Sequence, residues 1–389
     1  MKKLFICTLL LLVGFVSFAQ KNDKAISIKG NVIDSSTQEG VPFASVWIEG
    51  TYIGVATDAD GHFIINIPTK YKASNIAFSA VGYASFEARV DETAKIDPLT
   101  VSLQPKLFLI NEVNVEGKSL VLQRILRNAV DGISKNYLQK TFSFDCYYKS
   151  EDFEGDSLVK SREAVVNIYD QDAYHRSSIA KTFKSINYKF TESRKSFENK
   201  TLADGATLLD DMLTFDIVRN TRNILDKHNL ALYDLTREAD IFFEGDSLVV
   251  IGYKSLKNDL PVVGQTGVKS YSGKIYINKT NYAVVKNELT IETTNIPTLG
   301  KSVIKKAGKD DNLTINITTT YGRIAYHYYL RGISYEMIMN GSKERRAQLL
   351  PLKIKVSNPD VFSGRDYFEQ EENKEDYWER FSIVFEGEE

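Results

Sequence analysis

Short runs of alternating apolar and polar residues recur along most of this chain, and each run ends in residues that favour turns. A period of two residues places alternate side chains on opposite faces of a β-strand. In the first hundred residues, the apolar members of these runs are Ile26, Ile28, Gly30 and Val32; Ala44, Val46 and Ile48; Phe63, Ile65 and Ile67; Ile76, Phe78 and Ala80; Phe86, Ala88 and Val90; and Leu99, Val101 and Leu103. This spacing predicts roughly seven strands, which form a small β-sandwich.

The composition of the 389-residue chain is that of a folded, water-facing protein, with 26% charged, 43% apolar and 11% aromatic residues. A disordered chain carries fewer aromatic residues and more net charge, and a membrane bundle is far more apolar. Because 49 Lys and Arg stand against 51 Asp and Glu, no excess of positive charge favours nucleic acid as a partner. At roughly 100–200 residues per domain, the length predicts two domains, or three at most.

Residues 1–19 have the pattern of a secretory signal peptide, in which two lysines precede an apolar run over 4–16 that ends in small residues. The run is too short to span a bilayer comfortably. We expect cleavage after Ala19, which removes Cys7 and changes the net charge from −2 to about −4 through the loss of the two lysines. No later apolar run approaches twenty residues, so we expect an exported chain without a membrane helix.

One cysteine, Cys146, remains after cleavage, and a single thiol cannot form an internal disulfide. Cys146 alternates with Phe142 and Phe144, which predicts a small side chain in the core on a strand. A reactive thiol or an intermolecular disulfide is the alternative.

Four strings in the first hundred residues carry a family resemblance: 29–34 (KGNVID), 40–51 (GVPFASVWIEGT), 54–63 (GVATDADGHF) and 78–83 (FSAVGY). They resemble the carboxypeptidase-regulatory-like domain, a transthyretin-like sandwich common at the N-termini of Bacteroidota cell-surface proteins. We assign residues 24–105 to this domain. The resemblance implies a seven-stranded sandwich with a non-catalytic role.

The Asp-Ala-Asp-Gly string at 58–61 is open to two interpretations. A calcium loop needs further oxygen ligands and an acidic residue downstream, whereas His62 and an apolar run follow at once. We therefore expect a tight hairpin turn with Gly61 at positive φ and His62 on the solvent side of a strand. No metal ligand set is predicted.

Residues 106–118 form the expected linker, and their Asn-Glu-Val-Asn-Val string is similar to the segment that joins this sandwich to the plug of TonB-dependent receptors. Such a receptor needs a plug and a barrel of several hundred residues, and 389 − 118 leaves 271. The length therefore argues against a receptor.

Residues 119–389 are predicted to form a second domain, an antiparallel curved sheet with one or two packed helices. We expect a first helix over 119–136, capped by Ser119, because apolar residues recur at helical spacing on one stripe, and a second helix over about 208–228. Predicted strands follow the same alternation at 142–149, 159–169, 231–243, 248–255, 269–277, 282–292, 313–321, 326–339, 352–356 and 381–385.

The heptapeptide Phe-Glu-Gly-Asp-Ser-Leu-Val occurs twice, at 153–159 and 243–249. Gly-Asp suits the turn of a short hairpin, so we interpret both copies as hairpin tips. Each copy contains Asp-Ser-Leu, which resembles the acceptor of Bacteroidota periplasmic O-glycosylation, and this makes Ser157 and Ser247 candidate modification sites.

The segment 269–289 is predicted to be a hairpin that turns at 278–281, with an apolar face and a charged face. It is similar to the sheet of bacterial lipoprotein-carrier-like periplasmic proteins, in which a curved antiparallel sheet covers helices. The second domain also resembles the periplasmic part of a Bacteroidota family of unknown function that continues into a C-terminal barrel. We expect that barrel to be missing here, because the chain stops at Glu389.

No catalytic or cofactor motif stands out among the four histidines, His62, His175, His228 and His327. Cys146 and a histidine could form a dyad only if the fold brought them together. The most distinctive aromatic string is Tyr326, His327, Tyr328 and Tyr329, for which we expect packing in the core and on the sheet, with a ligand face for sugar or lipid as the alternative.

The leading hypothesis is a non-enzymatic exported cell-envelope protein that acts as a binding or scaffold module for a protein partner or glycan. The first alternative is a periplasmic lipid or lipoprotein carrier, with a cavity between the helix at 119–136 and the sheet that contains Ile275 and Leu289. The second is a hydrolase with an unrecognised site. We expect the protein in the periplasm or at the periplasmic face of the outer membrane, without a cofactor.

Overall fold

The computed structural model describes residues 25–51, 53–106, 115–155, 157–198, 207–294, 311–324, 326–366 and 377–378. The signal peptide over 1–19, most of the linker and the strand expected at 381–385 lie outside these residues. In the part of the chain that the structure describes, no helix is both long and apolar enough to cross a membrane.

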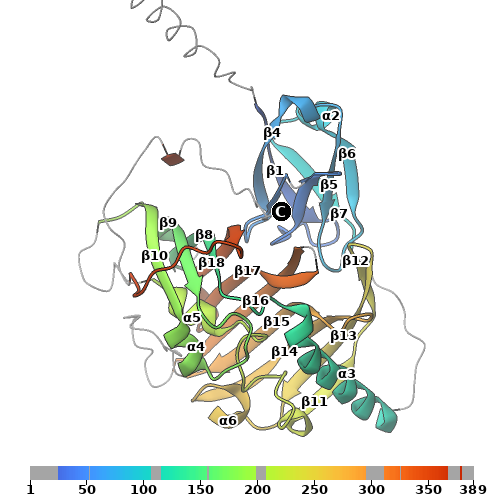
Figure 1. The fold of residues 1–389 in the computed structure, drawn as a ribbon, viewed down its shortest axis with the longest axis vertical. Helices are drawn as coiled ribbons and strands as arrows, with labels where there is room; N and C mark the ends of the chain where they lie inside the picture. The colour runs from blue at the N-terminus through green and yellow to red at the C-terminus, as the bar shows by residue number, and fades with distance from the viewer. Residues whose placement is uncertain are drawn as a thin grey trace, which may run out of the picture.

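The first hundred residues form a sandwich of seven strands in two sheets, as predicted (Figure 1). One sheet has the order β4-β1-β7, from strands β1 (Ala25–Asp34), β4 (His62–Pro68) and β7 (Leu99–Leu103). The other has the order β3-β2-β5-β6, from strands β2 (Ser45–Ile48), β3 (Gly54–Ala56), β5 (Asn75–Ser79) and β6 (Phe86–Arg89). Only two single-turn helices, η1 (Thr69–Tyr71) and α2 (Val90–Thr93), interrupt the described strands.

The alternation explains the core of the sandwich, because the apolar residues of each run point inward. In β4, for example, Phe63, Ile65 and Ile67 are buried, whereas His62 and Ile64, which alternate with them, are exposed. The apolar members of the other strands join the same core or pack against it, except Gly30, which has no side chain, and Phe86, which is 44% exposed.

The rest of the described chain builds one curved sheet of eleven strands. Its order is β10-β9-β8-β18-β17-β16-β15-β14-β13-β11, with β12 paired to β13. The strands are β8 (Phe142–Glu154), β9 (Ser157–Asp170), β10 (Ile186–Lys195), β11 (Tyr233–Arg237), β12 (Ile241–Phe243), β13 (Asp246–Ser255), β14 (Val268–Asn278), β15 (Val284–Thr293), β16 (Leu313–Ile324), β17 (His327–Met339) and β18 (Ser342–Lys355). All neighbouring strands are antiparallel, as predicted.

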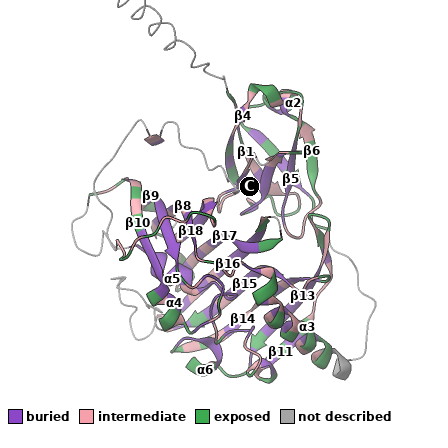
Figure 2. Ribbon diagram, in the orientation of Figure 1, coloured by how far each residue is buried: buried purple, intermediate pink, exposed green. Residues whose placement is uncertain are grey.

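Helices cover one face of this sheet, and the sandwich covers part of the other (Figure 1). The long helix α3 (Val115–Asn136) crosses the helix-covered face, as the periodicity over 119–136 predicts. The shorter helices are α4 (Ile179–Ser185), α5 (Leu209–Thr214), η3 (Leu230–Leu232) and α6 (Leu260–Val263). Because both faces are covered, consecutive residues of central strands are buried, and Figure 2 shows these strands mostly as buried.

Three local predictions are wrong. The helix expected over 208–228 extends only over α5, and the remaining residues form turns. Ser119 is not the helix cap, because α3 already begins at Val115. The strands expected at 142–149 and 159–169 are too short, because β8 and β9 continue in paired form until they meet in a tight turn at Gly155.

Candidate functional site

The residues 326–329, for which a ligand face was the alternative to core and sheet packing, do not form one accessible face. Tyr326 is 88% exposed and His327 is exposed, but Tyr328 and Tyr329 are only 4% and 5% exposed. Tyr328 packs on Tyr137, with ring centroids 5.7 Å apart, inside the main core. The two buried tyrosines belong to β17, which lies in the middle of a sheet covered on both faces, so neither can meet a ligand. Ligand binding by Tyr326 and His327 stays an untested alternative.

A cysteine–histidine dyad is incompatible with the positions of these residues. Cys146 has no exposed surface and lies in the main core, as its alternation with Phe142 and Phe144 predicts. Burial raises the pKa of its thiol well above the ordinary value, which disfavours the nucleophilic thiolate. All four histidines are exposed. Of the described residues, no histidine is hydrogen-bonded to Cys146.

Both copies of the repeated heptapeptide lie at hairpin tips, as predicted. The first joins β8 to β9 and the second joins β12 to β13, and Gly155 and Gly245 adopt φ of 63° and 85° at the turns. Ser157 is exposed at its tip, whereas Ser247 is only partly exposed and lies opposite Phe242. Asp156 of the first Asp-Ser-Leu string lies outside the described residues. Glycosylation at either serine stays a prediction.

The turn at 58–61 is a hairpin turn in which Gly61 adopts a φ of 81°, as expected. Donor atoms of Asp58, Asp60 and His62 lie within 4.8 Å of one another, so a cation could in principle approach them. These carboxylates already have partners in the fold. One Asp58 oxygen accepts from the backbone N–H groups of Asp60 and His62 at 2.9 Å each, and Asp60 pairs with the Arg346 guanidinium. The cluster by itself therefore does not indicate a metal site.

The sandwich contacts the large sheet through a group of buried apolar side chains, which we call the docking cluster. Its buried members are Phe43, Tyr147, Val165, Leu350, Leu352 and Trp378. Phe43 comes from the sandwich. The other members, apart from Trp378, come from strands β8, β9 and β18 of the large sheet. Adjacent residues of β8 illustrate the two faces, because Tyr147 joins the docking cluster while Cys146 and Tyr148 join the main core.

Polar contacts flank the docking cluster. Arg346 of β18 pairs with Asp60 of the sandwich and with Glu151 of β8, whose oxygen accepts at 2.6 Å and 2.9 Å. The Gln348 side chain accepts from the backbone N–H of Ala59 at 2.8 Å. In a second set of contacts, Ser45 accepts from Arg331, which also reaches Glu244. The sandwich is thus held by apolar packing and by two sets of hydrogen bonds.

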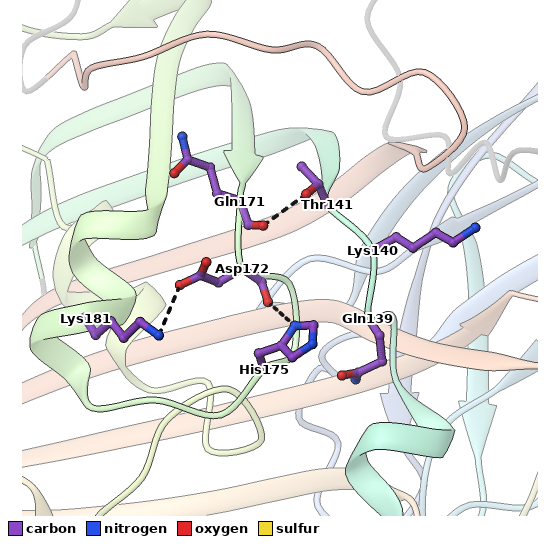
Figure 3. A pocket seen from close by; sticks show the side chains of 7 residues that line it. All are labelled: Gln139, Lys140, Thr141, Gln171, Asp172, His175 and Lys181. Carbon is purple, nitrogen blue, oxygen red and sulfur yellow. Dashed lines mark hydrogen bonds and ion pairs between the residues drawn. The ribbon is translucent and has the colours of Figure 1, made fainter.

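An open pocket of about 650 Å³ is lined by residues that carry polar side chains, and we call it the polar pocket (Figure 3). Three separate segments contribute: the residues between α3 and β8, the turn after β9, and α4. The lining residues of this polar pocket are Gln139, Lys140, Thr141, Gln171, Asp172, His175 and Lys181. Of these, only His175 was singled out from the sequence, because the segments come together only in the fold.

Hydrogen bonds fix the backbone of the polar pocket. The Thr141 hydroxyl donates to the Gln171 carbonyl at 3.0 Å, and the His175 Nδ1 lies 2.8 Å from the Asp172 carbonyl. A carbonyl only accepts, so Nδ1 carries the hydrogen and Nε2 is left for another partner. The Lys181 ammonium lies 4.0 Å from the Asp172 carboxylate, and both side chains are partly exposed.

A buried ion pair between Asp170 and Arg219 holds the turn that lines the pocket. Arg219 donates to both oxygens of Asp170, at 2.8 Å and 3.0 Å, and to the His175 carbonyl at 2.9 Å. Asp170 also accepts from the backbone N–H groups of Asp172 and Ala173. The backbone of Ala173 adopts a φ of 47° at this turn. Burial outweighs the guanidinium and raises the pKa of Asp170 to about 6. The turn that carries Asp172 and His175 is therefore pre-organised.

Comparison with known families and structures supports the interpretation of the N-terminal strands. Residues 28–115 match the model of the CarboxypepD_reg-like domain, which confirms the resemblance of this segment. Comparison with curated proteins gives no match.

Among solved structures, a LolA superfamily protein from Nitrosomonas europaea is 11% identical, with coverage of 61% of this chain and 94% of that chain and a TM-score of 0.25. A DUF1329 family protein from Desulfovibrio piger is 6% identical, with coverage of 60% and 92% and a TM-score of 0.27. Similarity this low says nothing about the function of the chain.

Proposed function

We propose that this chain is a non-enzymatic, exported cell-envelope protein that acts as a binding or scaffold module in the periplasm or at the periplasmic face of the outer membrane. The observation that carries the proposal is the docking of the sandwich onto the sheet. Apolar packing around Phe43 and the Arg346–Asp60 pair join the two modules into one body. Two modules that are held in one relative orientation present their surfaces in a fixed arrangement, which lowers the entropic cost of binding a large partner.

The filled core makes a lipid carrier the weaker proposal. Leu126 of α3 and Ile275 of β14 have no exposed surface, and Leu289 of β15 is 3% exposed. These side chains belong to the same core cluster. A cavity large enough for an acyl chain would leave accessible surface on its walls, and these three side chains have almost none.

Sedimentation of the mature chain with isolated envelope material tests the proposal. Residues 20–389 would be mixed with peptidoglycan sacculi and, separately, with outer-membrane vesicles, and the bound fraction measured against protein concentration. We expect saturable binding to one of these materials. Phe43→Ala should weaken it by loosening the docking, whereas Phe86→Ala, at a sandwich position that is 44% exposed, should not. Absence of saturable binding to both materials would contradict the proposal.

A further inference from the structure

Strand β4 of the sandwich has an open edge. It ends the three-stranded sheet β4-β1-β7, and among the described residues no strand pairs with its outer side. Figure 1 shows β4 along one side of the sandwich. A strand at the end of a sheet leaves a row of backbone N–H and carbonyl groups with which a further strand can pair. The β4 edge is therefore a place where another chain can extend the sheet.

The register of the β1–β4 ladder shows which groups of β4 point outward. The Val32 N–H donates to the Gly61 carbonyl at 2.8 Å, which fixes the phase of this antiparallel ladder. Every second residue after Gly61 bonds to β1, so Ile64 and Asn66 direct their backbone groups away from it. No described residue forms a hydrogen bond with these outward groups. Ile64 and Asn66 each offer one donor and one acceptor to another strand.

The fold limits pairing to these two residues. His62 uses its outward groups within the turn, because its N–H donates to the Asp58 carboxylate and its carbonyl accepts from the Asp58 N–H, each at 2.9 Å. At the other end, Pro68 has no N–H to donate. A strand that pairs with β4 therefore gains a short ladder at Ile64 and Asn66.

β4 lacks the features that protect sheet edges from association. Protected edges are very short, bulged or charged. β6 carries Glu87 and Arg89, and β11 carries Asp234 and Arg237. By contrast, the seven residues of β4 include no Lys, Arg, Asp or Glu, and Ile64 near its centre is 41% exposed. Pairing with another strand would remove this apolar side chain from water.

The charges at the two ends of β4 indicate which strand fits. Asp58 and Asp60 precede the strand, and the exposed Lys70 and Lys72 follow it. Asp60 also pairs with Arg346, whereas the Oδ2 atom of Asp58 takes no part in the hydrogen bonds of the turn. Antiparallel pairing of two identical strands places the acidic end of one beside the basic end of the other. Parallel pairing would place like charges together, so β4 is complementary to itself in the antiparallel direction only.

We propose that β4 pairs with β4 of a second copy of this chain, antiparallel and centred on Ile65. Ile64 of each copy then lies opposite Asn66 of the other, which satisfies the outward backbone groups of both residues. The two-fold relation joins two three-stranded sheets into one continuous sheet. Because the ladder is short, the dimer is weak and forms with rising concentration. This self-association goes beyond the proposed binding to envelope material and does not depend on it.

Sedimentation velocity of residues 20–389 at about 1–200 µM tests the pairing. We expect the weight-average sedimentation coefficient to rise with concentration, and to rise less at high ionic strength because salt screens the charges at the strand ends. Ile64→Lys should weaken association about tenfold, since it places like charges on neighbouring strands. The matched control is Ile96→Lys, at an isoleucine of the same domain that is 54% exposed and lies outside β4. Both positions are exposed, so both variants should fold.

Charge reversal tests the antiparallel direction. Lys72→Glu should weaken association about threefold, because it removes an attraction to the acidic end of the other copy. Lys95→Glu makes the same change at an exposed lysine of the sandwich away from β4 and should leave association unchanged.

Hydrogen exchange locates the contact. The Ile64 and Asn66 amides should exchange more slowly in concentrated than in dilute wild-type protein, because pairing removes them from water.

A monomer at every concentration would overturn the proposal. So would a dimer that Ile64→Lys and Ile96→Lys weaken equally, or one in which the Ile64 and Asn66 amides exchange at an unchanged rate. If the chain stays monomeric yet binds sacculi or outer-membrane vesicles, the pairing fails and the proposed function stands. If it dimerises through β4 but binds neither material, the reverse holds.

Discussion

The aromatic ring of Phe43 in the sandwich lies directly over the bare backbone of Gly332 in β17. A Cβ placed on Gly332 would come within 3.1 Å of the Phe43 Cδ1 and 3.2 Å of the Leu350 Cδ2, closer than ordinary van der Waals contact. Phe43 reaches this position with a backbone φ of 57°, a conformation that aromatic residues rarely adopt. A strained residue on one module and a missing side chain on the other thus form the centre of the docking cluster.

Phe43→Ala should separate the unfolding of the sandwich from that of the sheet. Removing a buried phenylalanine ring costs about 3 kcal/mol, part of it from the cavity left behind. The loss falls at the contact between two modules that each have their own core. We expect a single urea transition for the wild-type chain and two transitions for Phe43→Ala, followed by fluorescence and circular dichroism. Phe86→Ala is the control, and a single unshifted transition in Phe43→Ala would contradict the docking role.

The Arg346–Asp60 pair should contribute less than the ring of Phe43. Asp60 is 38% exposed at its side chain, and solvent screens such a pair. Arg346 also pairs with Glu151, which is buried and keeps Lys149 as a second partner at 2.8 Å. A double-mutant cycle with Asp60→Asn and Arg346→Met should therefore give a coupling of about 0.5–1 kcal/mol in urea unfolding. A coupling near zero would show that this contact does not hold the sandwich.

Cys146 should be inert in the folded protein. It has no exposed surface, and burial raises the pKa of its thiol, so both access and the thiolate fraction are low. We expect labelling by a thiol-reactive chromogenic disulfide to be at least 100-fold slower in native buffer than in 8 M urea. Rapid labelling of the native chain, or a disulfide-linked dimer on a non-reducing gel, would support the alternative of a reactive thiol.

Ser157 should be the modified serine if the chain carries an O-linked glycan. Ser157 is exposed on a hairpin tip, whereas Ser247 is only partly exposed and pairs across its hairpin with Phe242. We expect the intact mass of native protein to exceed that of residues 20–389, and Ser157→Ala but not Ser247→Ala to abolish the excess. A mass equal to that of residues 20–389 would exclude glycosylation and confirm cleavage after Ala19.

The sequence predicted those parts of the fold in which one face is buried against one partner. Alternation located the strands of the sandwich, and helical spacing located α3. When only one face of an element is buried, apolar residues recur in the sequence with the period of that element. It failed over 208–228, where apolar residues also recur. There the Asn220 and Asn223 amides donate to nearby backbone carbonyls and hold turns in place of a helix.

The polar pocket could not be predicted from the sequence. Lys140, Asp172 and Lys181 belong to three segments whose spacing matches no motif, and they meet only because β8 pairs with β9 and α4 follows. The Tyr326–Tyr329 string left two interpretations open, because aromatic residues suit both a binding face and a packed strand. The sandwich and helices cover both sides of the sheet to which Tyr328 and Tyr329 belong, so these two side chains pack in the core as expected.

The stability of the chain should depend on Asp210 in weakly acidic solution. Burial raises the pKa of Asp210 to about 6, although Arg365 lies 3.7 Å away and opposes the shift. Because the folded pKa lies above the ordinary value of 3.8, the folded state binds more protons than the unfolded state between pH 4 and 6. The contribution of Asp210 is therefore fully present below about pH 4 and is lost as the pH rises through about 6.

Urea unfolding at pH 4.5, 5.5, 6.5 and 7.5 measures this contribution by comparison with Asp210→Asn. We expect the free energy of unfolding of the wild type, relative to Asp210→Asn, to decrease as the pH rises across this range. Asp234→Asn, at an exposed position on β11, is the control and should follow the wild-type profile. Asp170 contributes the same trend to all three proteins, because burial raises its pKa to about 6 as well, so the comparison isolates Asp210. Parallel profiles for the wild type and Asp210→Asn would contradict a raised pKa at this site.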